Sequence, residues 1–210
     1  EFTWQGGEPT LMGLEFFERA VALQRRYAAG KEVRNTLQTN ATLIDNDWAR
    51  FLAREGFLVG VSLDGPQTLH DIHRLDKQGR SSFESTMRGI RCLQQHGVEF
   101  NILVTVSKEI AAEPLTVYRY LKSIGARYIQ FNPVVERMPL PADTAIGLSF
   151  AKPPHWKSTT HFREGPSQAS DAPTLTAQSV GPQAYGAFLI AIYDEWVRQD
   201  VGDVHVINFD

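Results

Sequence analysis

A loop near the start of the chain combines two glycines with a carboxylate, Gly6-Gly7-Glu8. The glycines allow the backbone to approach a ligand closely, and Glu8 supplies a fixed negative charge suited to an ammonium group. A tight turn with a solvated Glu8 is the alternative interpretation. The loop is not a dinucleotide-binding fingerprint, because the GxGxxG pattern is absent and Pro9 follows directly.

A serine and an arginine form a second stretch with binding chemistry. Ser62 ends an apolar segment, which would place its hydroxyl at the tip of a strand. Arg74 follows after a short polar stretch and offers a planar guanidinium group suited to a carboxylate. The intervening Asp64-Gly65-Pro66 is equally consistent with a plain turn.

Two histidines could bind a metal, whereas the single cysteine is explained by packing. His70 and His73 are three residues apart, which would allow one helix face to carry both, as in a metal-dependent hydrolase. A zinc site needs three or four ligands, and the other histidines are scattered, so we treat this as the weaker hypothesis. Cys92 is the single cysteine, so no disulfide and no thiolate cluster can form within these 210 residues, and we expect it to pack in or beside the core.

These residues must be positioned by elements that alternate along the chain. Strands are predicted at 1–6, 33–39, 57–63, 98–106, 127–132 and 203–209, and helices at 13–28, 45–56, 82–97, 113–124 and 182–200. In the first helix we expect the buried stripe to be Phe16, Ala20, Leu23 and Tyr27. The alternation predicts an α/β fold with a parallel sheet, either barrel-like or doubly wound. A Pro/Ser/Thr-rich stretch at about 133–181 predicts an irregular insertion in a single domain spanning 1–210.

The composition sets limits on location and partners. The 210 residues are 42% hydrophobic and carry a net charge of −3, which gives no electrostatic case for nucleic acid or an anionic membrane. No apolar run is long enough to span a bilayer, and no signal peptide opens the chain. We therefore expect a cytoplasmic protein that binds neither nucleic acid nor membrane.

Several motifs, taken in order, resemble one family. The segments WQGGEPTLMG, LQTNATLID, FLVGVSLDGP, HDIHR, GVEFNILVTV, RYIQFNPVVER and DEWVRQDVGDVHVINFD are similar in order and spacing to the central part of anaerobic sulfatase-maturating enzymes, which are radical S-adenosylmethionine (SAM) proteins. The resemblance extends over nearly the whole chain and is weakest at about 140–178. It implies a partial (β/α)6 TIM-like barrel of the radical SAM type, incomplete at both ends.

The resemblance also implies an activity. Members of the family use a [4Fe–4S] cluster and a reducing electron donor to cleave SAM, and the resulting 5′-deoxyadenosyl radical oxidises a Cys or Ser of a sulfatase polypeptide to Cα-formylglycine. Carried over to this chain, Gly6, Gly7 and Glu8 would receive the amino group of SAM, and Ser62 and Arg74 would hold its carboxylate. Val135 would line the adenosine side, and Gln5 would approach the peptide substrate.

The chain departs from the family pattern in ways that affect function. The CxxxCxxC loop of the family precedes the GGE strand, and its auxiliary-cluster cysteines and proposed catalytic Asp follow the region matched here. Ala41 replaces the glycine usual in the TNG motif, which would restrict that turn. We therefore expect an oxidoreductase fragment that is inactive alone and supplies no cluster ligands and no catalytic residue. The alternative is a non-catalytic remnant that binds SAM or a peptide.

Overall fold

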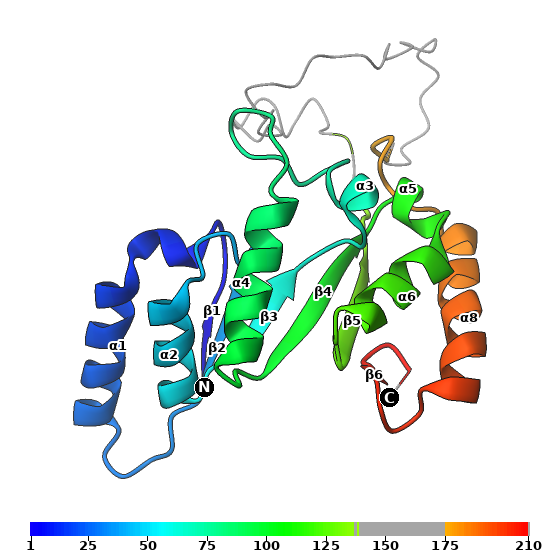
Figure 1. Cartoon of the computed structure of the whole chain (residues 1–210). Helices are drawn as coiled ribbons and strands as arrows, with labels where there is room; N and C mark the ends of the chain where they lie inside the picture. Colours follow the sequence, from blue (N-terminus) through cyan, green and yellow to red (C-terminus); the bar gives the residue numbers. More distant parts are fainter. Residues whose placement is uncertain (137, 139–174, 210) are drawn as a thin grey trace.

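The computed structural model describes residues 1–136, 138 and 175–209 and has a single parallel sheet (Figure 1). Its strands follow chain order, β1-β2-β3-β4-β5-β6, which confirms the barrel-like winding because a doubly wound sheet reverses its order. The strands are β1 (Phe2–Trp4), β2 (Asn35–Thr39), β3 (Leu58–Ser62), β4 (Phe100–Val106), β5 (Tyr128–Pro133) and β6 (His205–Val206). Within the described ranges β1 and β6 do not pair with each other, so the barrel is partial.

Helices cover the outer face of this sheet (Figure 1). The helical elements are η1 (Pro9–Met12), α1 (Leu14–Tyr27), α2 (Asn46–Glu55), α3 (Gln67–His70), α4 (Phe83–Gln95), α5 (Lys108–Ala111), α6 (Pro114–Ser123) and α8 (Pro182–Gln199). Alternate strand residues such as Ile102, Val104 and Val106 are fully buried beneath them. The intervening residues face the concave inner side, where Leu58 is 45% exposed. None of the helices in these ranges is long and apolar enough to cross a membrane.

The predicted buried stripe of α1 is wrong by one residue. Phe17 and Val21 are buried, whereas Phe16, Leu23 and Tyr27 are 37%, 53% and 71% exposed. Two apolar stripes run side by side along this helix, and hydropathy alone does not distinguish them. Aromatic packing distinguishes them, because the Phe17 ring lies edge-on to the buried Trp48, with centroids 5.3 Å apart, whereas Trp4 lies edge-on to both Phe16 and Phe17.

The last predicted strand is shorter than expected. Only His205–Val206 form β6, because the side chain of Asn208 takes over the pairing. Its Oδ1 accepts from the backbone N–H of Phe131 at 2.9 Å, and its Nδ2 donates to the Phe131 carbonyl at 3.0 Å. The predicted insertion at about 133–181 lies mostly outside the described residues, and β5 continues to Pro133.

The turn after β2 is held against α4 at close range. Ala41 adopts a left-handed conformation with φ of 58°, which costs an L-residue about 1–2 kcal/mol. The turn forms even though alanine replaces the glycine usual there. A Cβ added to Gly89 of α4 would lie 2.1 Å from the carbonyl oxygen of Ala41, and the Thr86 hydroxyl donates to the Asn40 carbonyl at 3.0 Å. Backbone–helix contact therefore fixes the end of β2.

A buried histidine fixes the segment after β3. His70 is 1% exposed, and its Nδ1 lies 3.5 Å from the backbone nitrogen of Asp64. Its Nε2 lies 3.1 Å from the Ser82 hydroxyl, which donates to the Arg74 carbonyl at 2.7 Å. Burial lowers the pKa of His70 to about 4, although the Asp64 carboxylate opposes the shift. The ring is thus neutral and ties both ends of this segment together.

The close contact at Gly89 predicts opposite effects for two helical glycines. Gly→Ala in a helix interior ordinarily stabilises by about 1 kcal/mol, and Gly186 of α8 has no atom within 4 Å of an added Cβ. We expect Gly186→Ala to raise the free energy of unfolding by up to that amount. Gly89→Ala should lower it by about 1–3 kcal/mol, because the backbone must move. Urea unfolding of both variants checks the contrast, and equal effects would contradict it.

The low pKa of His70 predicts a pH-dependent stability. The unfolded chain gains a proton near pH 6.5, whereas the folded chain gains it only near pH 4, so stability falls as the pH drops through this window. The full loss is on the order of 3 kcal/mol. Urea unfolding between pH 7 and pH 4.5 should show a smaller slope for His70→Gln than for the wild type. Leu23→Gln, at an exposed position of α1, adds no titrating group and is the control that should keep the wild-type slope.

Candidate cofactor-binding site

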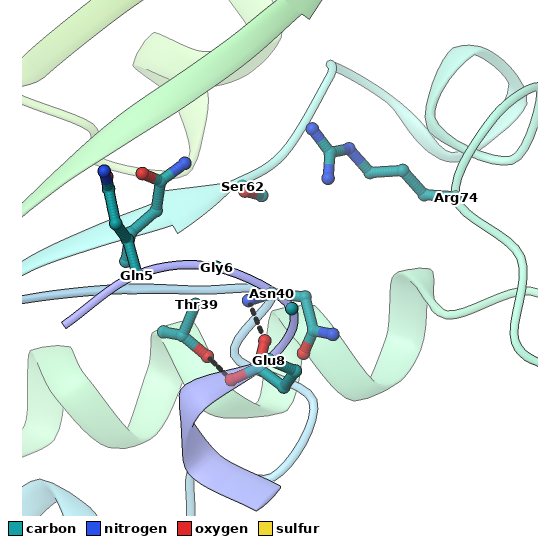
Figure 2. A pocket seen from close by; sticks show the side chains of 9 residues that line it. Gln5, Gly6, Glu8, Thr39, Asn40, Ser62 and Arg74 are labelled. Carbon is teal, nitrogen blue, oxygen red and sulfur yellow. Dashed lines mark hydrogen bonds between the residues drawn. The ribbon is translucent and has the colours of Figure 1, made fainter. Parts of the chain in front are cut away.

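The carboxyl ends of the first three strands enclose a polar cavity of about 420 Å³. Parallel strands place these ends at one edge of the sheet, where barrel enzymes collect their binding residues. Figure 2 shows Glu8 beside Thr39 and Asn40, with the guanidinium group of Arg74 turned toward Ser62. The cavity is lined by Gln5, Gly6, Gly7, Glu8, Gln38, Thr39, Asn40, Ser62 and Arg74.

The β1 loop approaches the cavity through its glycines. Gly6 and Gly7 have φ angles of 98° and 59°, which other residues rarely adopt. A Cβ added at either position would meet no atom within 4 Å, so the space beside this backbone is open. A ligand can therefore contact the backbone of the loop directly.

The carboxylate of Glu8 is fixed by four hydrogen bonds. Its Oε1 accepts from the Thr10 backbone N–H at 3.1 Å, the Thr10 hydroxyl at 2.6 Å and the Thr39 hydroxyl at 2.7 Å. Its Oε2 accepts from the Asn40 backbone N–H at 2.8 Å. Glu8 thus caps η1 and joins the β1 loop to the end of β2. Each carboxylate oxygen offers about two acceptor sites, so Oε2 is the oxygen with capacity left for an ammonium group.

Arg74 is held by a buried carboxylate that the sequence did not single out. Asp64 is 2% exposed, and its two oxygens accept from Arg74 Nε at 2.5 Å and Nη2 at 3.1 Å. The second hydrogen of Nη2 reaches the Thr105 hydroxyl at 2.8 Å, and the Thr105 backbone N–H donates to Asp64 at 2.7 Å. Within the described part of the protein Nη1 makes no hydrogen bond, so it is the nitrogen that a ligand can use.

The arrangement can bind a molecule that carries both a carboxylate and an ammonium group. The Ser62 hydroxyl and Arg74 Nη1 supply donors on one side, and Glu8 with the β1 loop supplies acceptors on the other. The guanidinium group offers one nitrogen rather than a two-nitrogen fork, because Asp64 occupies the other side. The Ser62 hydroxyl lines the same cavity and can act as a second donor to a carboxylate.

The structure brings together most of the residues selected from the sequence. Gln5, Gly6, Gly7, Glu8, Ser62 and Arg74 line one cavity, whereas Val135 follows β5 at the same edge, is 63% exposed and does not line it. Within the described ranges, His70 and His73 belong to no group of three His, Cys, Asp or Glu side chains that could hold an ion. His73 instead contacts Glu109, and Cys92 lies in α4, away from the cavity.

Four further residues were missed by sequence reasoning. Gln38, Thr39 and Asn40 line the cavity, and Asp64 positions Arg74. The signal for the first three was their place at the end of a predicted strand, next to the GGE loop in a parallel sheet. For Asp64 the Asp-Gly-Pro turn gave a sufficient explanation without a second role.

A family model matches the part of the protein that builds this site. Residues 1–121, from β1 into α6, match the Radical SAM superfamily. A serine-type anaerobic sulfatase-maturating enzyme of Bacteroides thetaiotaomicron is 40% identical over 209 residues, covering 100% of this chain and 46% of that protein. A cysteine-type enzyme of Clostridium perfringens is 44% identical over 131 residues, covering 62% of this chain and 35% of that protein.

Solved structures agree with the sequence relatives. The structure described as native anSMEcpe with bound AdoMet and Cp18Cys peptide superposes with a TM-score of 0.79 at 32% identity, covering 100% of this chain and 50% of that one. The chain spans about half the length, or less, of these three relatives. The chain belongs to the radical SAM superfamily and is similar over its whole length to anaerobic sulfatase-maturating enzymes.

Proposed function

We propose that these residues form the SAM-binding part of an oxidoreductase that converts a Cys or Ser of a sulfatase to Cα-formylglycine. The convergence of the β1 loop, Ser62 and Arg74 on one polar cavity carries this proposal. Relatives of both serine and cysteine type match the chain, which supports Ser or Cys as the target residue.

The residues present fit SAM. A cavity of about 420 Å³ lies in the range of small-molecule sites. The methionyl carboxylate would accept from Ser62 and Arg74 Nη1, and the ammonium group would face Glu8 and the β1 loop. Val135, which follows β5 at the same edge of the sheet, would border the adenosine.

The residues present do not fit an iron–sulfur cluster. Three thiolates are needed to bind the SAM-cleaving [4Fe–4S] cluster in this family, and the 210 residues contain Cys92 alone. Cluster ligands would have to come from outside this sequence. When bound, cluster and SAM together supply the oxidising radical chemistry, while the residues of this sequence hold and orient SAM.

The proposed partners follow from the same site. A related structure is described with a bound peptide, which supports a sulfatase polypeptide as substrate. The reaction also requires a reducing electron donor. We place the protein in the cytoplasm, where thiols and low-potential centres stay reduced.

The cysteine content favours one second candidate, a non-catalytic module that holds SAM or a peptide. The DNA sequence that precedes the codon for Glu1 distinguishes the two functions. A CxxxCxxC sequence encoded in frame a short way before Glu1 supports the oxidoreductase, and a stop codon or an unrelated sequence there supports the module.

The Arg74 geometry predicts a selective loss of SAM affinity. Arg74→Lys keeps a cation for Asp64 but removes the free nitrogen, so SAM should bind about 1.5–3 kcal/mol more weakly, or roughly 10- to 150-fold. Isothermal titration calorimetry measures the change, with Arg88→Lys on the exposed face of α4 as the control. Equal affinity of Arg74→Lys and wild type would rule out the carboxylate role.

Removing the Arg74 side chain is predicted to lower the stability of the protein as well as its SAM affinity. Arg74→Ala leaves the buried Asp64 carboxylate without its cation, which should lower the free energy of unfolding by about 3–5 kcal/mol. Arg74→Ala combined with Asp64→Ala should recover part of that loss, because no buried charge remains. Urea unfolding of the single and double variants tests this, and an equally unstable double variant would contradict it.

The cysteine count predicts the metal content. After anaerobic reconstitution with iron and sulfide, the 210-residue chain should hold no stoichiometric cluster and form no 5′-deoxyadenosine from SAM. Iron analysis and chromatography of the nucleoside products give both readouts. A stoichiometric cluster on these residues would contradict the proposal that the cluster ligands lie outside this sequence.

A further inference from the structure

Arg74 belongs to a closed cycle of hydrogen bonds, which we call the hydrogen-bond cycle. The Asp64 backbone N–H donates to His70 Nδ1 at 3.5 Å, and His70 Nε2 lies 3.1 Å from the Ser82 hydroxyl oxygen. The Ser82 hydroxyl donates to the Arg74 backbone carbonyl at 2.7 Å, and the Arg74 guanidinium group donates to the Asp64 carboxylate. Arg74 is thus the member of the cycle that lines the SAM-site cavity.

The Ser82 hydroxyl determines the direction of the donors around this cycle. A hydroxyl carries one proton, and here that proton goes to the Arg74 carbonyl, which can only accept. The contact between Ser82 and His70 therefore uses a proton on Nε2, and Nδ1 of the neutral imidazole accepts from the Asp64 N–H. Each member donates to the next, in the order Asp64, His70, Ser82, Arg74 and back to Asp64.

The position of Ser82 in the fold makes this use of its hydroxyl informative. Ser82 is the N-cap residue of α4, where a serine side chain normally accepts from a backbone N–H in the first turn of the helix. Among the described residues the Ser82 side chain makes no such capping hydrogen bond. Its hydroxyl is instead committed to the backbone of Arg74, outside the helix.

Burial makes the hydrogen bonds of the cycle depend on one another. Asp64 and His70 are 2% and 1% exposed, so water does not replace a partner that either of them loses. In such surroundings consecutive hydrogen bonds also polarise each other, by about 10–30% per bond. Opening the cycle at one place should therefore loosen the Arg74–Asp64 pair as well.

We propose that His70 and Ser82 are positioning residues that raise SAM affinity by holding Arg74 in the orientation that presents Nη1 to the methionyl carboxylate. This inference rests on the proposed function and adds two residues that are not among the described residues lining the cavity. The cycle holds the side chain of Arg74 through Asp64 and its backbone through Ser82. The guanidinium group is thus ordered before SAM binds, and the binding free energy is not reduced by the cost of ordering it.

The test opens the cycle at positions away from the cavity and measures SAM affinity. Ser82→Ala removes the hydrogen bond to the Arg74 carbonyl, and His70→Leu removes both imidazole hydrogen bonds. Thr105 still contacts the guanidinium group in both variants, so we expect weaker binding rather than its loss. SAM should bind about 3- to 10-fold more weakly, as for the loss of one ordinary hydrogen bond. Isothermal titration calorimetry measures the affinities at neutral pH, after urea unfolding has shown that each variant is fully folded without denaturant.

Two further variants separate the hydroxyl from other effects of substitution. Ser85→Ala is the matched control in the same helix, because the Ser85 hydroxyl contacts Arg88 outside the cycle, and it should keep the wild-type affinity. Ser82→Thr retains a hydroxyl and should recover most of the affinity that Ser82→Ala loses. If His70→Leu does not fold, the comparison of Ser82→Ala with Ser82→Thr decides.

The imidazole nitrogens of His70 provide a spectroscopic readout of the cycle itself. Nuclear magnetic resonance of the protein labelled with nitrogen-15 distinguishes protonated from unprotonated imidazole nitrogens. We expect a protonated Nε2 and an unprotonated Nδ1 in the wild type at neutral pH. The opposite tautomer, or a charged imidazole, would contradict the direction of the donors and overturn the proposal.

The binding results separate this inference from the proposed function. Weaker SAM binding by Ser82→Ala that Ser82→Thr restores and Ser85→Ala does not share supports the positioning role. Unchanged affinity in Ser82→Ala, no recovery in Ser82→Thr, or an equal loss in Ser85→Ala overturns that role and leaves the SAM site standing. A wild-type protein that does not bind SAM defeats the proposed function, and the positioning role with it.

Discussion

The polar end of the barrel depends on one buried carboxylate. Asp64 is removed from water, and a charge in that position is tolerated only when it is paired and hydrogen-bonded. Arg74 and the backbone of Thr105 meet that requirement and thereby join the segment after β3 to β4. The neutral His70 ring holds the other end of the same segment. The orientation of the guanidinium group is therefore a consequence of satisfying Asp64.

A second constraint acts on the neighbouring strands. Glu8 satisfies donors from its own loop and from the end of β2, so β1 and β2 are fixed relative to each other by a carboxylate as well as by pairing. Ala41 is held in an unfavourable backbone conformation by the packing of its turn against α4. Gly89, which has no side chain, allows the Ala41 carbonyl to lie close to that helix. The convex helical layer thus determines the shape of the cavity on the opposite side.

The sequence predicted the features that follow from periodic apolar spacing and missed those that depend on contacts between particular pairs of residues. Six strands, their parallel arrangement and the position of Ser62 followed from apolar spacing and from the rule that strand ends gather at one edge. The buried stripe of α1 did not, because two apolar stripes compete and the contact of Phe17 with Trp48 of α2 distinguishes them. Asp64 was missed because its partner lies ten residues away and a turn explained it locally.

The open sheet has a consequence for the behaviour of the protein in solution. β1 and β6 each pair with a single strand within the described residues, so each leaves one row of backbone N–H and C=O groups without a neighbouring strand there. Phe2 adds a ring that is 48% exposed beside the first of these rows. Unpaired strand edges can recruit strands from other molecules, and very short edge strands limit that pairing. With three residues in β1 and two in β6, each edge offers only a short template, which limits edge-to-edge association of these 210 residues in solution.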